Sequence, residues 1–265
     1  MHDQPHEAKP AAVGRERPHC YICGTIENLS KDHIPPKGFF PPNDYENLIT
    51  APLCYNCHSP FANMDEQMRV WISAGAAATS ENAKWIWKNK VMNSTFKRSP
   101  KLRKYIAEKH FRKMSVETPS GSVVADVMTM PQSQVHPFIR RLTKGFLYSF
   151  YPEHDYFADN FNVVYQPEPS EAVELATKLS SCSYGKDVCR IWHGLTKDNT
   201  KCGVWIFLFY NAACFVCFHG DRNLITSQQV EEGYKENSNL PPKTVKSYRI
   251  ALPSSFSTCN APTIG

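Results

Sequence analysis

Hydrophobic residues in the first half of the chain recur at helical spacing. The apolar positions of the clearest run are Met64, Met68, Trp71 and Ile72, three or four residues apart. Such a run predicts a helix with one apolar face. Gly75 is expected to end or bend it, Ser80 to begin a second helix, and Ser99, which precedes a proline, to begin a third. Residues 63 to about 113 are therefore expected to be helical.

From residue 114 onward, short apolar runs between turn residues favour strands. The expected strands are a hairpin within 116–130, then 161–165, 188–195, 203–210 and 212–219. Helices are expected over 134–150, where phenylalanine or leucine recurs every four residues, and over 170–179. The last two strands, joined at Asn211, are the most apolar and are expected to be the centre of an antiparallel sheet. This mixture predicts an α+β domain.

Composition is that of an ordinary folded protein in water. Of the 265 residues, 42% are hydrophobic and 21% are charged. No apolar run approaches about eighteen residues, so we expect no transmembrane helix and no membrane partner. The N-terminus lacks the apolar stretch of a signal peptide. Six of the ten cysteines lie outside the first sixty residues, mostly in apolar surroundings. These features predict a protein of the reducing cytoplasm.

Positive charge is concentrated in one segment. Between Asn82 and Lys113 there are eleven basic residues and one acid, so the segment nets +10 while the whole chain nets +5. A basic stripe of this kind is typical of a surface that follows nucleic-acid phosphates, although a solvated helix face is the alternative. The residues expected to contact phosphates are Lys97, Arg98, Lys101, Arg103 and Lys104.

Two CxxC pairs lie near the N-terminus, Cys20 with Cys23 and Cys54 with Cys57. Each pair can present two thiolates from one turn, and four thiolates are the usual ligands of a structural zinc ion. The 30 residues between the pairs exceed a zinc-ribbon gap, so a folded segment is expected there. A third pair, Cys214 and Cys217, lies in an apolar strand, where its side chains face opposite sides, so we expect no metal shared by this pair.

The segment between the first two pairs contains the dipeptide Asp32-His33, and His58 directly follows the last cysteine. In a strand, Asp32 and His33 point to opposite faces, so one can bind a metal while the other faces a water molecule. His58 is expected to open a helix packed on the same hairpin. Oxygen and imidazole ligands with open positions suit a catalytic divalent ion.

The order CxxC, DHIxP, ENL, LCxxCH over residues 19 to 62 resembles the HNH endonucleases, the zinc-containing branch of the ββα-metal nucleases. This resemblance implies a general base at His33 and a catalytic ion, Mg²⁺ or another divalent metal, held by Asp32 and His58. It implies that Asn47 orients the loop that carries His33, and that the four cysteines bind structural zinc. A further ligand one turn after His58 would fall at Ala62, which cannot bind metal.

Four parts are expected from these patterns. They are a disordered tail at 1–18, an HNH ββα-metal unit at 19–65, a basic helical segment at 66–113, and an α+β domain at 114–265 for target or partner recognition. The expected function is metal-dependent cleavage of nucleic acid, with DNA as the first expectation, as an effector of a restriction or phage-defence system. The alternatives are a zinc module that binds nucleic acid without cutting it, and an interaction subunit of a larger complex.

Overall fold

The computed structural model describes residues 18–45, 47–118, 121–128, 130–157, 159–165, 169–196 and 202–220. The predicted disordered tail lies outside these residues apart from Pro18, and so does the segment after Gly220. The fold mixes helices with antiparallel sheets, as the hydrophobic pattern predicts. Among the described helices, none is both long and apolar enough to cross a membrane.

The N-terminal unit is a hairpin followed at once by a long helix. Strands β1 (Leu29–Ile34) and β2 (Ile49–Cys54) pair antiparallel, and α1 (Tyr55–Ala76) begins at the next residue. The connection between the strands is irregular apart from the short η1 (Lys37–Phe39), as expected for a segment with four prolines. The predicted apolar face of α1 is buried, and the helix ends one residue beyond Gly75.

The basic segment folds as short helices with a small core of their own. The elements are α2 (Glu81–Ile86), the π-helix η2 (Trp87–Thr95), α3 (Phe96–Arg98) and α4 (Pro100–Lys109). The predicted start at Ser80 is confirmed, because its hydroxyl accepts a hydrogen bond from the backbone N–H of Ala83. Val70 of α1 packs with Val91, Phe96 and Ile106 in this second core.

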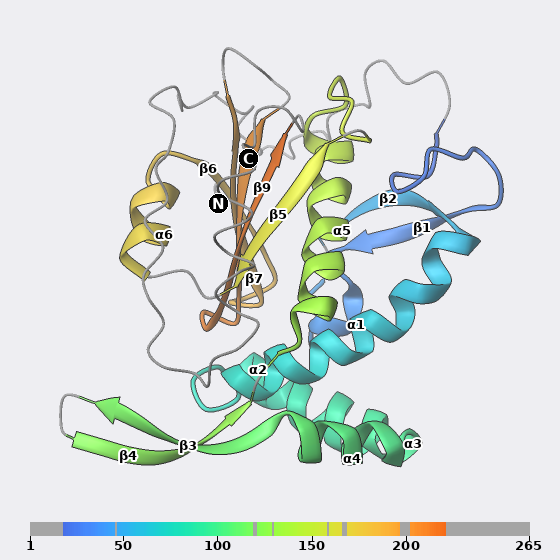
Figure 1. The fold of residues 1–265 in the computed structure, drawn as a ribbon. Coiled ribbons are helices and arrows are strands. Elements are labelled where there is room, and N and C mark those ends of the chain that lie inside the picture. Colours follow the sequence, from blue (N-terminus) through green and yellow to red (C-terminus); the bar gives the residue numbers. More distant parts are fainter. Residues whose placement is uncertain are drawn as a thin grey trace, which may run out of the picture.

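Helix α5 (Gln132–Phe150) lies between the hairpin unit and the large sheet (Figure 1). It follows the hairpin of β3 (Phe111–Thr118) and β4 (Gly121–Met128), which begins five residues earlier than expected. On one side α5 contacts β1 and β2, and on the other β5 and β9. Gly145 allows the close approach to β1, since a Cβ there would lie 2.0 Å from Ile34 Cδ1.

The large sheet has five antiparallel strands in the order β5-β9-β8-β7-β6. The strands are β5 (Asn160–Tyr165), β6 (Ser180–Tyr184), β7 (Cys189–Leu195), β8 (Gly203–Phe209) and β9 (Ala213–Gly220). The expected central hairpin is β8–β9, whose turn residues Tyr210 and Asn211 both have positive φ, at 52° and 55°. The polar strand β6 was not expected from the pattern.

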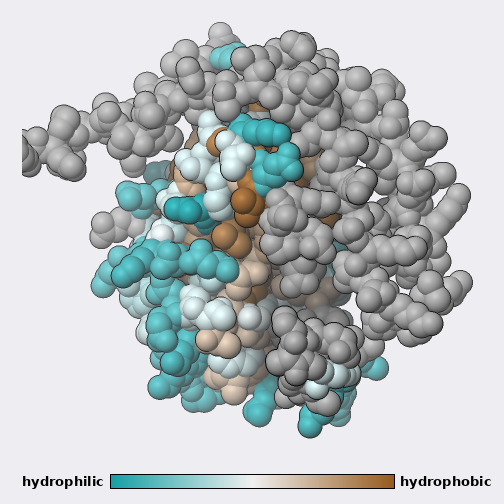
Figure 2. Space-filling view, turned by 90° about the vertical axis from the view of Figure 1, so that its left-hand side faces the viewer, coloured by the Kyte–Doolittle hydropathy of each residue, from teal (hydrophilic) through white to brown (hydrophobic). Residues whose placement is uncertain are grey.

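The two faces of the sheet carry different cores. The face toward α5 shares one hydrophobic core with the N-terminal unit. This core includes both Tyr21 of that unit and Cys217 of the sheet. The opposite face, with α6 (Pro169–Ala176), packs a smaller core that includes Leu175, and Cys214 packs against it. Viewed from the α6 side, hydrophobic residues form a narrow strip among hydrophilic ones (Figure 2). The predicted separation of Cys214 from Cys217 is confirmed, whereas α6 begins one residue earlier and ends three earlier than expected.

Candidate functional site

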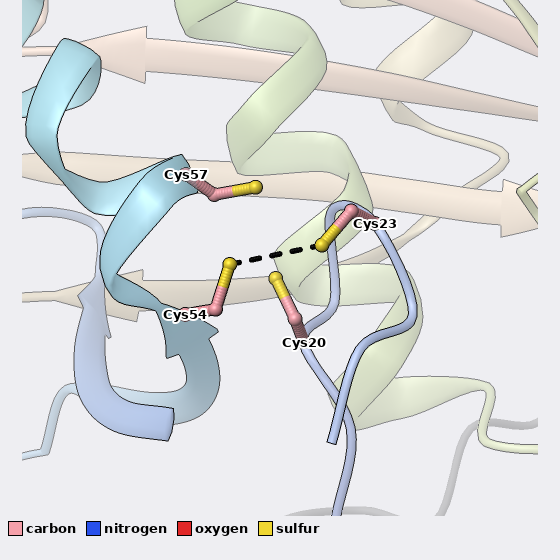
Figure 3. Close-up of side chains that lie close together, drawn as sticks. All are labelled: Cys20, Cys23, Cys54 and Cys57. Atoms are coloured by element: carbon pink, nitrogen blue, oxygen red, sulfur yellow. Dashed lines mark hydrogen bonds between the residues drawn. The ribbon is translucent and has the colours of Figure 1, made fainter. Parts of the chain in front are cut away.

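The four cysteines of the two N-terminal pairs form one cluster. Cys20 and Cys23 lie in the turn before β1, Cys54 ends β2, and Cys57 lies in the first turn of α1 (Figure 3). Their sulfur atoms all lie within 4.8 Å of one another. The sulfurs of Cys23 and Cys54 are 3.7 Å apart, too far for a disulfide, and all four thiols are free.

This spacing fits a zinc ion. Two thiolates of a tetrahedral site with Zn–S bonds of about 2.3 Å lie about 3.8 Å apart, close to the separation of Cys23 and Cys54. Burial acts to raise the pKa of Cys20, but backbone N–H groups, first that of Cys54, outweigh it and lower the pKa to about 7. Burial and the neighbouring cysteines raise the pKa of Cys57. Four thiolates this close repel one another, and a zinc ion would supply the compensating positive charge.

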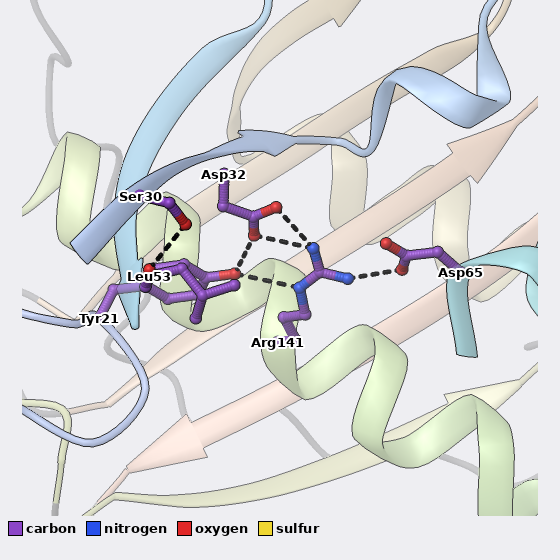
Figure 4. Close-up of polar contacts among 6 residues, drawn as sticks. All are labelled: Tyr21, Ser30, Asp32, Leu53, Asp65 and Arg141. Atoms are coloured by element: carbon purple, nitrogen blue, oxygen red, sulfur yellow. Dashed lines mark hydrogen bonds and ion pairs between the residues drawn. The ribbon is translucent and has the colours of Figure 1, made fainter. Parts of the chain in front are cut away.

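Asp32, expected to hold a catalytic metal, is engaged with Arg141 of α5. Both carboxylate oxygens lie 2.8 Å from Arg141 Nη2, and the Tyr21 hydroxyl donates to Oδ2 at 2.5 Å (Figure 4). The exposed fractions of the Arg141 and Asp32 side chains are 2% and 8%. As the side chains stand, Asp32 offers no free oxygen to a metal ion, so the expected ligand pair Asp32 and His58 does not fit one in this arrangement.

Arg141 also joins β1 to α1. Its Nη1 donates to Asp65 Oδ1 at 2.5 Å, and its guanidinium lies 4.7 Å from the centre of the Phe61 ring. Burial acts to lower the pKa of Arg141, but the charges of Asp65, Tyr21 and Asp32 outweigh it and raise that pKa. Burial raises the pKa of Asp65 to about 6, against the lowering effect of Arg141. A permanently charged guanidinium therefore occupies the space between the two carboxylates.

His33 lies on the other face of β1 from Asp32, as the alternation of a strand requires. It is half-buried, and burial, followed by the charge of Lys37, lowers its pKa below the usual 6.5. Its imidazole is therefore neutral at neutral pH and can accept a proton. The pairing of Ile34 with Ile49 brings the exposed Asn47 to the same end of the hairpin as His33.

His58 is exposed in the first turn of α1, near the opposite end of the hairpin, where Leu29 pairs with Cys54. Among the described residues, two groups of three or more potential metal ligands lie close together, and neither contains Asp32, His33 or His58. The structure thus assembles the expected zinc ligands, whereas the expected pair Asp32 and His58 is too small for such a group and stays a prediction.

The expected phosphate contacts all lie on the surface. Lys97, Arg98, Lys101, Arg103 and Lys104 are exposed on α3 and α4. Arg98 Nη2 forms an ion pair with Glu66 of α1 at 2.7 Å. Lys90, in the same basic segment, is half-buried and donates to the backbone oxygen of Phe40 at 2.8 Å. The segment therefore presents most of its charge to solvent and uses Lys90 to hold the loop after β1.

The sequence contained no signal for Arg141 or Asp65. Arg141 lies 109 positions from Asp32 and looks like one cation in a helix, so only the folded chain shows their contact.

Comparison with protein-family models, with curated proteins and with solved structures gives no match for this chain.

Proposed function

We propose that this protein acts on nucleic acid: the basic helices bind phosphates, and the zinc-stabilised hairpin–helix unit hydrolyses the strand. The observation that supports the proposal is the order of elements. One cysteine pair precedes β1, Asp32-His33 lies within β1, and the second pair joins β2 to α1. This order is the one that the resemblance to HNH endonucleases implies.

His33 has the chemical properties that the proposed hydrolysis needs. Its pKa lies below 6.5, so most of its imidazole is unprotonated at pH 7. A general base must be in that form to take a proton from the attacking water. Because the side chains of Asp32 and His33 lie on opposite faces of β1, the His33 ring takes no part in the contact between Asp32 and Arg141.

Arg141 sets the condition for metal-dependent cleavage. A divalent ion could bind Asp32 only if Arg141 Nη2 released that carboxylate. The Arg141 side chain, of which 2% is exposed, would then keep Asp65 as its remaining charged partner. Breaking a buried ion pair on one side costs about 3–5 kcal/mol. The Asp32–Arg141 contact thus favours a second candidate function, a zinc-stabilised protein that binds nucleic acid without cutting it.

One experiment distinguishes the two candidates. Zinc-loaded protein is incubated with end-labelled DNA and, separately, RNA, in the presence of Mg²⁺ or Mn²⁺, and binding and cleavage are measured in the same samples. Cleavage that depends on the added ion supports the hydrolytic function. Binding that weakens with salt, without cleavage, supports the second candidate, and the absence of binding to either nucleic acid contradicts both.

A further inference from the structure

Three metal-ligand atoms converge outside the four-cysteine cluster. The Nε2 atom of His154 lies 2.7 Å from Asp159 Oδ2, and the Nδ1 atom of His219 lies 2.9 Å from the same oxygen. The exposed fractions of these side chains are 3%, 4% and 0%. We call these residues the His–Asp–His cluster.

Strand pairing brings the cluster together from two segments, the connection between α5 and β5 and strand β9. Asp159 directly precedes β5 and His219 lies near the end of β9, where Asn160 pairs with Gly220. His154 comes from the connection between α5 and β5. Its backbone N–H bonds the oxygen of Tyr151, and the N–H of Asp159 bonds that of Tyr156, so turns set both side chains.

Hydrogen bonding within the cluster leaves one polar atom unused. One oxygen of the Asp159 carboxylate, Oδ2, faces a ring nitrogen of each histidine within hydrogen-bond distance. An ionised carboxylate accepts only, so both imidazoles donate to it. The buried Nε2 of His219 is then an acceptor with no hydrogen-bond partner among the described residues.

We infer that the His–Asp–His cluster is a second metal site, which binds a divalent transition-metal ion of the zinc class. Two imidazoles and one carboxylate are a common ligand set for such ions. Ligands about 2.0–2.1 Å from a tetrahedral ion lie about 3.3 Å apart, so each contact opens by about half an ångström on binding. The ion then takes the place of the two protons in the cluster, and these protons move to the other ring nitrogens, His154 Nδ1 and His219 Nε2.

The surroundings suit a buried site with three protein ligands and a water molecule as the fourth ligand. The ring of Phe161 stacks on His219 at 5.8 Å, and that of Tyr156 stacks on His154 at 6.4 Å. These aromatic walls lower the local dielectric constant and so strengthen the attraction between the ion and the carboxylate. The imidazole ring of His219 also requires Gly203, because a Cβ at that position would lie 2.4 Å from Nε2.

This site would fix the loop that packs on the first cysteine pair. Phe157, between His154 and Asp159, lies 3.8 Å from the position of a Cβ on Gly24 and 5.7 Å, ring to ring, from His19. Lys144 of α5 lies over the Phe157 ring, 5.6 Å from its centre. An ion bound by His154, Asp159 and His219 therefore ties β9 to the loop beside the four cysteines.

The test is the metal content of the untagged full-length protein together with X-ray absorption at the zinc edge. With both sites filled, the protein holds two zinc ions per chain, and sulfur accounts for about half of the ligands, with nitrogen and oxygen as the rest. His219→Ala should lose one equivalent and leave zinc with sulfur ligands alone. The matched control is His193→Gln, which changes a buried histidine of β7 that bonds the Tyr151 hydroxyl and should keep both ions.

Two results overturn the inference. One is a wild-type protein that, after dialysis against excess zinc, still holds a single zinc ion whose ligands are all sulfur. The other is equal metal content in wild type and His219→Ala. If that variant fails to fold, the wild-type absorption measurement decides alone. Neither result depends on whether the protein binds or cuts nucleic acid.

Discussion

Asp32 shows how a distant residue decides what a carboxylate can do. In the sequence it stands beside His33 and looks available to a metal ion, but in the fold Arg141 and Tyr21 engage both of its oxygens. Removing one partner of a buried ion pair leaves a charge without compensation. The first role of Asp32 is therefore to hold β1 against α5.

Replacement of Arg141 measures this role. Arg141→Gln should lower the free energy of unfolding by about 3–5 kcal/mol, because Asp32 and Asp65 are left buried without their cation. Urea unfolding of zinc-loaded protein gives the value. The control is Arg140→Gln on the same helix, an exposed side chain that lies over the Phe161 ring and whose loss should cost no more than about 1 kcal/mol. Equal losses in both variants would contradict a stabilising contact at Arg141.

The titration of His33 can be measured without any activity. Burial and the charge of Lys37 lower the pKa of His33, so the NMR signals of the His33 ring should titrate with a midpoint below 6.5. Lys37→Ala should move that midpoint upward, because the positive charge that opposes protonation is lost. Lys31→Ala, at an exposed position of the same strand, should leave it unchanged. A midpoint above 6.5 in the wild type would show that His33 does not have the proposed environment.

At the scale of elements, the sequence predicts much more of the fold than of the site. The spacing of Met64, Met68 and Trp71 predicts α1 because a helix packed on one side must repeat its apolar positions. The turn at Asn211 is predictable because a polar residue that favours turns lies between two strongly apolar runs. Strand β6 escapes prediction because Ser180–Tyr184 is mostly polar, and η2 because no residue within it signals a π-helix. Contacts such as Asp32 with Arg141 join residues 109 positions apart, and no local pattern carries them.

The basic helices should govern affinity for nucleic acid. Replacing Lys101, Arg103 and Lys104 by alanine should weaken binding and reduce the slope of log K against log salt by up to about 2.7 for duplex DNA, since fewer counterions are released. Fluorescence anisotropy over a salt series measures both. The control removes the same charge from exposed positions elsewhere: Lys178, Lys186 and Arg190. Equal effects of the two triple variants would assign the binding to net charge and not to α4.

At the scale of the whole molecule, the zinc-ligand cluster and the large sheet depend on one core. That core runs from Cys20 and Tyr21 through α5 to Cys217, so loss of the zinc should destabilise more than the hairpin. Cys57→Ser should lose one equivalent of zinc, and its thermal midpoint should fall. Cys182→Ser, outside the cluster, should keep the zinc content and the thermal midpoint of the wild type. An unchanged midpoint after the loss of that zinc would show that the sheet folds independently of the hairpin.

The most direct test of the account is the rate at which zinc-loaded His33→Ala cuts nucleic acid, compared with wild type and with Lys31→Ala. Proton transfer by a positioned side chain is worth about 10²–10⁴ in rate. If His33 is the general base, His33→Ala loses a factor of that size while it keeps its zinc, its fold and its affinity for nucleic acid, and Lys31→Ala cuts at the wild-type rate. Cleavage by His33→Ala at the wild-type rate, or no cleavage by the wild-type protein with any divalent ion, would contradict that role for His33.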